Sequence, residues 1–177
     1  MGAGKSALLV IDVQLGPIWG TYKKDETVSV IQKMIAKAES ENVPIVYIQF
    51  EGPEGDLLER GTQFWQFASG ITPREQDIVI HKRAADSFYQ TELQEELQNR
   101  GVTNLVVVGV RTEFCIDTTC RAAISQGFDV TLVEDGHTTV DGFYPAEQII
   151  NHHNSTLRGV KTPEYQIAVV KADEVNF

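Results

Sequence analysis

Three residues that can take part in nucleophilic catalysis follow hydrophobic runs in this 177-residue sequence. They are Asp12 at the end of residues 7–12, Lys82 after residues 77–81, and Cys115 shortly after residues 105–110. A buried carboxylate and a buried ammonium are each costly alone, but together they offset each other and can set the protonation of a thiol between them. This combination favours acyl transfer by a cysteine nucleophile. A structural Asp–Lys pair beside an inert, packed cysteine is the alternative.

The position of Cys115 in its predicted helix supports a reactive role. We expect it in the first turn, where unpaired backbone N–H groups and the positive end of the helix dipole stabilise a thiolate. Cys120 belongs instead to an apolar stripe with Ile116 and Ile124, which predicts a packing role. Positions five apart on a helix are about 140° apart around its axis, so a disulfide between the two cysteines would require the helix to unwind.

Hydrophobic patterning predicts strands and helices in alternation along the whole chain. Helices are expected between the strands, and a capping box of Thr91 and Gln94 opens one of them. The last helix spans residues 145–157, with Ile149, Ile150 and Leu157 facing inward. The strands are expected at residues 7–12, 45–49, 77–81, 105–110, 128–133 and 166–170. This alternation implies a three-layer α/β domain with a parallel sheet. Such sheets bind ligands at the carboxyl ends of their strands, where Asp12, Lys82 and residues 111–115 are predicted to lie.

Residues 51–73 interrupt the alternation with a segment rich in glycine, proline, charge and aromatic side chains. We predict a long loop with at most one short helix, and long loops in compact domains are usually functional. Aromatic residues near the predicted site are candidate walls of a substrate pocket, with core packing as the alternative. These candidates are Phe50, Phe64, Trp65, Phe88 and Tyr144.

Composition limits the partners and the compartment. The chain is 42% hydrophobic and carries a formal net charge of −10, which would repel nucleic acid and anionic lipid, so we expect neither as a partner and a small molecule as substrate. A span of about 18 apolar residues, a secretory signal pattern and a disulfide framework are all missing, which predicts a cytoplasmic protein. Residues 1–6 are predicted to be a disordered tip, because their Gly-Lys-Ser precedes a strand, whereas a phosphate-binding loop follows one.

Three separated motifs make the chain resemble a known family. They are residues 8–14 (LLVIDVQ), His81-Lys82 leading to Ser87-Phe88 and Thr91-x-Leu93, and residues 108–119 (VGVRTEFCIDTT) followed by Ala122-Ala123 and Gly127-Phe128. In their order and spacing they resemble the isochorismatase-like cysteine hydrolases, which include nicotinamidases, N-carbamoylsarcosine amidases and isochorismatases. The resemblance implies a single domain over residues 1–177, a six-stranded parallel sheet of order 3-2-1-4-5-6, and a homo-oligomer, either dimer or tetramer.

The resemblance also implies residue roles. Asp12 would take the thiol proton, Lys82 would stabilise the charged forms, and Cys115 would attack a carbonyl to form a thioester that water then hydrolyses. A cis peptide bond would join Val110 to Arg111, and the backbone N–H groups of Arg111 and Cys115 would form the oxyanion hole. Gln14, at the end of the first motif, is a further candidate for substrate binding.

Departures from the family pattern narrow the expected chemistry. Nicotinamidases in this family bind a metal through histidines after the second strand, but this chain has no histidine before His81, so we predict neither a metal nor another cofactor. His81 should face away from Lys82, and we expect ordinary structural or surface roles for His81, His152 and His153. True isochorismatases cleave a vinyl ether and many lack a cysteine at the position of Cys115.

The presence of Cys115 therefore favours acyl chemistry over vinyl ether cleavage. The acidic net charge gives an anionic substrate no long-range attraction, although Arg111 can hold one carboxylate locally. A small neutral amide or ureide is thus the predicted substrate. The alternatives are isochorismatase or nicotinamidase activity, or a non-catalytic binding protein in which Cys115 serves as an oxidisable sensor.

Overall fold

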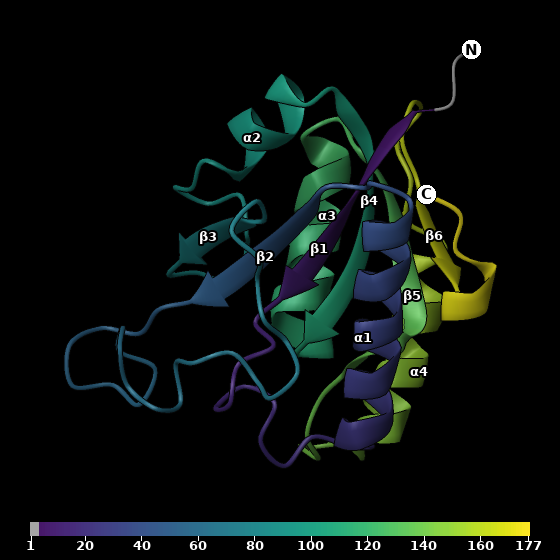
Figure 1. Cartoon of the computed structure of the whole chain (residues 1–177). Helices are drawn as coiled ribbons and strands as arrows, with labels where there is room; N and C mark the ends of the chain where they lie inside the picture. The colour runs from purple at the N-terminus through teal and green to yellow at the C-terminus, as the bar shows by residue number, and fades with distance from the viewer. Residues whose placement is uncertain (1–3) are drawn as a thin grey trace.

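The computed structural model describes residues 4–177, in which a six-stranded sheet lies between two layers of helices (Figure 1). The elements in chain order are β1 (Lys5–Ile11), α1 (Lys24–Ser40), β2 (Ile45–Phe50), β3 (Ile78–Lys82), α2 (Leu93–Asn99), β4 (Val102–Val110), the π-helical η1 (Thr112–Ile116), α3 (Asp117–Ser125), β5 (Asp129–Thr138), α4 (Ala146–Leu157), β6 (Ile167–Val170) and the 3-10 helix η2 (Ala172–Glu174). Residues 1–3 of the predicted disordered tip lie outside the described residues. The prediction is wrong for Lys5 and Ser6, which begin β1.

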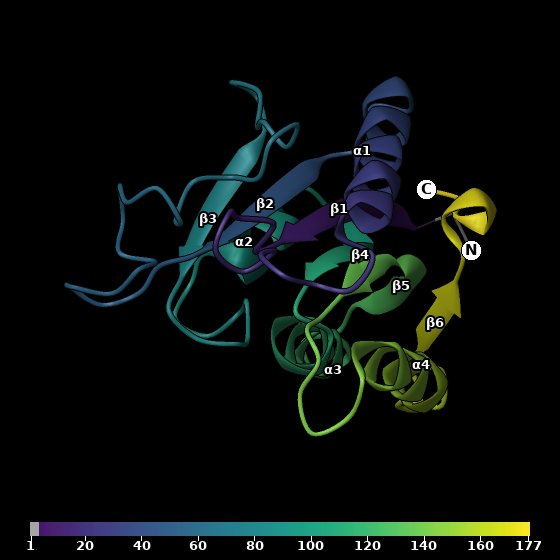
Figure 2. The same ribbon diagram turned by 90° about the horizontal axis from the view of Figure 1, so that it is seen from below.

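The strand order is β3-β2-β1-β4-β5-β6 and every pair is parallel, which confirms the predicted architecture. The central strands β1 and β4 are buried on both faces, as their continuous hydrophobic runs predict. Helix α1 covers one face of the sheet, while α3 and α4 cover the other (Figure 2). Side chains of β1 alternate between the two core clusters, with Leu8 and Val10 on the α1 side and Leu9 and Ile11 on the α3 side.

The carboxyl ends of β1 and β4 approach each other closely at Gly109. This residue has a φ of 133°, and a Cβ atom there would lie 2.1 Å from the carbonyl oxygen of Ile11. Only glycine fits such a contact between two backbones. The close approach brings Asp12, which directly follows β1, next to the end of β4, from which the chain runs into η1.

Strand β5 continues five residues beyond the predicted end at Val133, to Thr138. The pairing with β4 shifts register, because Val107 pairs with Leu132 whereas Gly109 pairs with His137. Residues 133–136 of β5 lie opposite Val108 alone and form a bulge-like irregularity in this ladder, a feature that commonly redirects side chains near functional sites. The apolar pattern ends at Glu134, which explains why the sequence predicted a shorter strand.

The predicted capping box of Thr91 and Gln94 is wrong. Helix α2 begins at Leu93 without a side-chain cap; the Thr91 hydroxyl donates to the Ser87 carbonyl at 2.6 Å and accepts only a long bond of 3.4 Å from the Leu93 N–H. Residues 51–73 form a long loop, as predicted, with turns and bridges but no helix. Within residues 4–177, no helix is both long and apolar enough to cross a membrane.

Candidate active site

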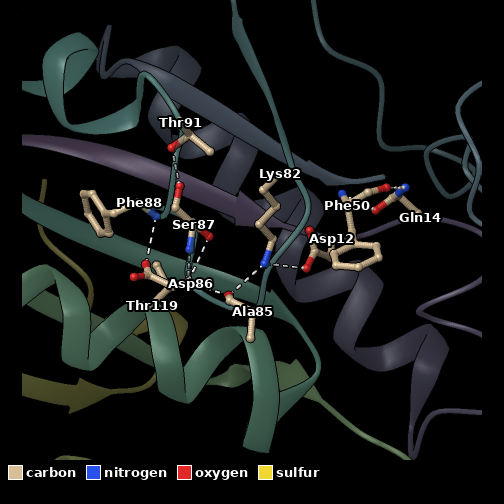
Figure 3. A network of polar contacts seen from close by, with 10 residues as sticks. All are labelled: Asp12, Gln14, Phe50, Lys82, Ala85, Asp86, Ser87, Phe88, Thr91 and Thr119. Atoms are coloured by element: carbon tan, nitrogen blue, oxygen red, sulfur yellow. Dashed lines mark hydrogen bonds and ion pairs between the residues drawn. The ribbon is translucent and has the colours of Figure 1, made fainter. Parts of the chain in front are cut away.

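A buried ion pair of Asp12 and Lys82 stands at the carboxyl edge of the sheet. Lys82 is the last residue of β3, and its Nζ lies 2.9 Å from Oδ2 of Asp12, with both side chains almost fully buried (Figure 3). Asp12 has a φ of 53°, a left-handed conformation that aspartate tolerates better than most residues. Apart from this ion pair, neither carboxylate oxygen has a hydrogen-bond partner of good geometry within the described chain, but the Cys115 thiol and the Phe50 backbone are close enough to oppose the rise that burial causes in the pKa of Asp12. The long lysine side chain thus spans β2 to reach a carboxylate that also neighbours the thiol.

The loop after β3 completes the surroundings of the Lys82 ammonium. Lys82 donates a second hydrogen bond to the carbonyl of Ala85 at 2.9 Å. That loop is tied to α3, because the hydroxyl groups of Ser87 and Thr119 are 2.9 Å apart and both are buried (Figure 3). The helix that follows the Cys115 segment therefore also holds the carbonyl that orients Lys82.

Cys115 lies in η1, a π-helical turn that precedes α3, and not in the first turn of an α-helix as predicted. It lines the same cavity as Asp12. Burial raises the pKa of the Cys115 thiol to about 12; the negative charge of Asp12 adds to this, and the charge of Lys82 opposes it. The predicted helix-start stabilisation of a thiolate is therefore outweighed, and the resting thiol holds its proton at neutral pH.

The pKa values of Asp12 and Lys82, the neighbours of the thiol, are shifted as well. Burial raises the pKa of Asp12, although the ammonium of Lys82 opposes this. Burial alone would lower the pKa of Lys82, but the charges of Asp12 and Cys115 outweigh it and raise that pKa. Lys82 therefore stays positively charged, and it can stabilise negative charge on either neighbour.

A cavity of about 550 Å³ opens above these groups. Its polar lining includes Asp12, Cys115, Arg111 and Asp56; its apolar walls include Trp19, Phe50, Leu57, Leu58, Phe64 and Phe114. Such a volume suits a small molecule, and the apolar walls favour uncharged parts of a ligand. Trp19 and Phe114 are 65% and 56% exposed, so their faces are available to a ligand. The sequence analysis did not select either, although Phe114 is adjacent to Cys115.

Gln14 and Trp65 support the pocket wall from behind. The Gln14 amide nitrogen donates to the Phe50 carbonyl at 2.9 Å, and its oxygen accepts from the Phe50 N–H (Figure 3). The same nitrogen also donates to the carbonyl of Trp65 at 2.8 Å. The indole of Trp65 stacks on His81, with ring centroids 5.7 Å apart. Of the predicted binding residues, Phe50 and Phe64 line the cavity, whereas Gln14 and Trp65 hold its wall in place.

Phe88 and Tyr144 lie away from this cavity. Phe88 packs in the core against Phe128, with ring centroids 5.9 Å apart. Tyr144 is exposed beside Phe143, in the loop before α4, and lines a neighbouring cavity. These two placements favour the alternative of packing or surface roles over a wall of the Cys115 pocket. The spacing of aromatic residues in the sequence could not distinguish between these outcomes.

Arg111 joins the cavity to the loop that follows β1. The peptide bond between Val110 and Arg111 is cis. The Arg111 Nε donates to the carbonyl of Pro17 at 3.3 Å, and its side chain forms no ion pair within residues 4–177. Arg111 is therefore a charge in the cavity that is available to an anionic group of a ligand.

The carboxylate after β2 is engaged by two arginines. Glu51 accepts from Arg60 at 2.8 Å on one oxygen and from Arg83 at 2.7 Å on the other. The hydrogen bond from Arg83 lowers the pKa of Glu51, with burial opposing and Arg60 assisting. In the part of the chain that the structure describes, no three His, Cys, Asp or Glu side chains are grouped to hold a metal ion. Glu51 therefore ties Arg60 of the 51–73 loop to Arg83, which directly follows β3.

The sequence analysis missed a buried histidine, His137 of β5. Its Nδ1 lies 2.8 Å from Oγ1 of Thr112, and its Nε2 lies 2.9 Å from Oδ1 of Asn154 in α4. Asn154 donates through Nδ2 to the Glu134 carbonyl, so its Oδ1 must accept from Nε2–H, and Nδ1 then accepts from Thr112. A fourth histidine in the sequence was the available signal, but nothing in its spacing relates it to Cys115.

Stability should fall in acid because His137 is held neutral. Burial lowers its pKa to about 4, and the hydrogen bond from His137 to Asn154 opposes this only in part. The unfolded chain protonates below about pH 6.5, so unfolding takes up one more proton between about pH 6.5 and 4 and the folded state loses about 3 kcal/mol across that window. Urea unfolding at several pH values checks this. The His137→Asn variant should lack this part of the slope; an unchanged slope would contradict the assignment.

The chain is similar to known proteins in both sequence and structure. Residues 6–161 match the sequence model of the isochorismatase domain. A streptothricin hydrolase of Streptomyces noursei is 33% identical over 138 residues, which are 76% of this chain and 50% of that protein, so the chain spans about half its length. The ureidoacrylate amidohydrolase RutB of Pseudomonas syringae pv. syringae (strain B728a) is 25% identical over 85% of this chain and 78% of that protein. The structure of an isochorismatase from Pseudomonas putida KT2440 superposes with a TM-score of 0.88 at 28% identity, and the match covers 97% of this chain and 90% of that one.

Proposed function

Because the chain belongs to the isochorismatase family of hydrolases, we propose that it cleaves a C–N bond of a small amide or ureide through a thioester on Cys115. The observation that carries this proposal is the buried Asp12–Lys82 pair, 2.9 Å apart, whose carboxylate lines the same cavity as the thiol. Both members of the pair also interact with the Cys115 thiol, and a nucleophile, a base and a fixed positive charge in mutual contact are what acyl transfer requires.

Asp12 acts as the base in the proposed reaction. The thiol keeps its proton at rest, so that proton must leave as the sulfur attacks, and the neighbouring carboxylate of Asp12 is the acceptor. The S–C bond forms, the C–N bond breaks, and the proton passes from Asp12 to the leaving nitrogen. Water then gives a proton to Asp12 and adds to the thioester carbonyl; the C–S bond breaks, the acid leaves, and Asp12 returns the proton to the sulfur. Lys82 keeps Asp12 ionised and stabilises the negative charge of each step.

The developing oxyanion would be held at the start of η1. The backbone N–H groups of Arg111 and Cys115 are the proposed donors, because Arg111 directly precedes η1 and Cys115 carries the sulfur within it. Donors of this kind work best when the backbone is rigid before substrate binds. The Ile116 N–H bond to the Arg111 carbonyl, 3.2 Å long, encloses Cys115 within one turn of η1 and supplies such rigidity.

The cavity supports a compact, largely uncharged substrate. Its walls are mainly apolar, and Arg111 is available for a single carboxylate at one side. The names of two relatives describe compatible chemistry: one hydrolyses streptothricin, and the other is an amidohydrolase of ureidoacrylate, a ureide. We therefore propose the amide and ureide class as the substrate, without a leaving group larger than the cavity of about 550 Å³.

A hydrolysis screen with intact-mass detection tests the proposal. Purified protein is incubated with nicotinamide, carbamoyl, ureide and lactam compounds, and amine or ammonia release is followed together with the protein mass. We expect turnover of at least one class and, after acid quenching, an acyl adduct that peptide mapping places on Cys115. Turnover that persists in a Cys115→Ala protein, or an adduct on Cys120, would contradict the mechanism. Cys120 is the matched internal control because it is a buried cysteine outside the cavity.

The same screen separates the competing functions. A redox sensor needs a thiol with a low pKa, whereas burial raises the pKa of Cys115 to about 12, so the site favours assisted catalysis over spontaneous oxidation. Oxidation of Cys115 by peroxide with no acyl adduct from any substrate would reverse that preference. A metal-dependent nicotinamidase would show stoichiometric metal in elemental analysis, together with loss of nicotinamide turnover on chelation.

A further inference from the structure

We propose that His137 is a positioning residue for Cys115 that acts through the hydroxyl of Thr112. Its kinetic consequences rest on the proposed hydrolase function, but its effect on the thiol can be measured without any substrate. The mechanism above does not use His137, although it is fully buried with both ring nitrogens hydrogen-bonded, and one of these bonds ends on the segment that carries the nucleophile.

The end of β5 and the residue that follows it hold two successive residues of η1. His137 of β5 bonds Thr112 at 2.8 Å, and the hydroxyl of Thr139, directly after the strand, donates to Oε1 of Glu113 at 2.9 Å. Both contacts reach the same segment, so the path of the chain at the end of β5 produces them together. Thr138, between them, points the other way and donates to the carbonyl of Tyr22 at 2.6 Å. The bulged end of β5 therefore fixes the start of η1 against the body of the sheet.

Thr112 transmits this restraint around Cys115. Its side chain is held by His137, while its carbonyl accepts the N–H of Asp117 on the far side of the cysteine. Arg111, the preceding residue, is bonded through its carbonyl to the N–H of Ile116. A π-helical turn is less common than an α-helical one and often occurs at functional sites, so it needs such external support. Displacement of Thr112 would shift the sulfur relative to Asp12.

Two substitutions of His137 separate its two hydrogen bonds. In His137→Asn the amide oxygen can stand at the same number of bonds from Cα as Nδ1, so it can still accept from Thr112. In His137→Gln the amide nitrogen can replace Nε2 and donate to Asn154, but the acceptor for Thr112 is lost. Both variants remove one buried hydrogen bond, so comparable losses of stability make them a matched pair. Thr112→Val removes the hydroxyl with almost no change in shape, and Thr112→Ser restores it.

Steady-state kinetics should separate the variants that lose the hydrogen bond between Thr112 and residue 137 from the variants that keep it. We expect His137→Gln and Thr112→Val to lower kcat by about 10- to 100-fold with little change in KM, because small misplacement of a reacting group has effects of that size. His137→Asn and Thr112→Ser should retain most activity. The double variant His137→Gln/Thr112→Val should be no worse than either single variant, because both remove the same interaction.

Alkylation of Cys115 by iodoacetamide gives a second, substrate-independent readout. The rate constant should depart from wild type in His137→Gln and Thr112→Val, and stay near the wild-type value in His137→Asn and Thr112→Ser. If the wild type hydrolyses no amide, the proposed function fails, while the alkylation pattern still decides the role of His137. The proposal would be overturned if His137→Asn and His137→Gln had equal effects on both readouts. It would also be overturned if the variants lowered the free energy of unfolding but changed neither kcat nor the alkylation rate.

Discussion

Replacement of Cys115 by alanine should lower kcat/KM by at least about four orders of magnitude, because the sulfur forms the covalent bond of the proposed reaction. The protein should still fold. Cys115 lies at the cavity surface and truncation removes one sulfur atom, so we expect the free energy of unfolding to change by about 1 kcal/mol or less. Initial rates on the best compound of the screen, with urea unfolding of the same preparations, measure both effects.

Cys120 supplies the matched control for this experiment. It is fully buried in the core beside Ile116 and Ile124, and burial raises the pKa of its thiol beyond any useful range. Cys120→Ala should therefore cost stability, of the order of 1 kcal/mol for a buried atom, and leave kcat/KM close to wild type. Residual activity of Cys115→Ala within about tenfold of wild type would remove Cys115 from the mechanism.

Asp12→Asn should cause the second largest effect, on activity and stability together. The variant loses the base and leaves the Lys82 ammonium in a buried site without its counter-ion, which is 2.9 Å away in the wild type. Removal of one partner of a buried pair costs about 3 to 5 kcal/mol. Loss of a catalytic base in a cysteine or serine site lowers kcat by about four orders of magnitude. Lys82→Met should give a similar loss of stability for the opposite reason, an unpaired buried carboxylate.

The double variant Asp12→Asn/Lys82→Met distinguishes catalysis from folding. It removes both charges, so the free energy of unfolding should recover much of what each single variant loses, because a buried pair is often replaced by neutral groups at little cost. Activity should not recover. Urea unfolding and rate measurements on all four proteins complete the cycle. Recovery of activity with stability would show that the Asp12–Lys82 pair serves the fold and not the reaction.

The sequence determined the order of the elements and the position of the ion pair. Continuous apolar runs such as residues 7–11 can be satisfied only by strands buried on both faces, and parallel strands present their carboxyl ends at one edge. A carboxylate after β1 and a lysine at the end of β3 are therefore brought to the same edge by topology. Burial then makes their pairing necessary, since either charge alone would be costly.

The tertiary structure decided the walls of the cavity and the support of the nucleophile. Phe88 and Phe114 are the same residue type and both lie within the motifs of the site, yet one packs on Phe128 and the other faces the cavity. Loop paths and helix packing decide such placements, and local pattern does not encode them. The apolar pattern of β5 ends at Glu134, so the continuation to His137 depends on pairing with β4 beyond a register shift.

The protonation state of the Cys115 thiol also depends on features that only the tertiary structure decides. Helix-start position alone favoured a thiolate at Cys115, a local argument that sequence can make. The folded chain instead surrounds the sulfur with low-polarity walls and the carboxylate of Asp12, and both raise its pKa. Desolvation and charge interactions depend on distances between β1, β3 and η1, segments far apart in the sequence. Sequence therefore determined which candidate groups meet at this edge of the sheet, and tertiary structure decided their charge states.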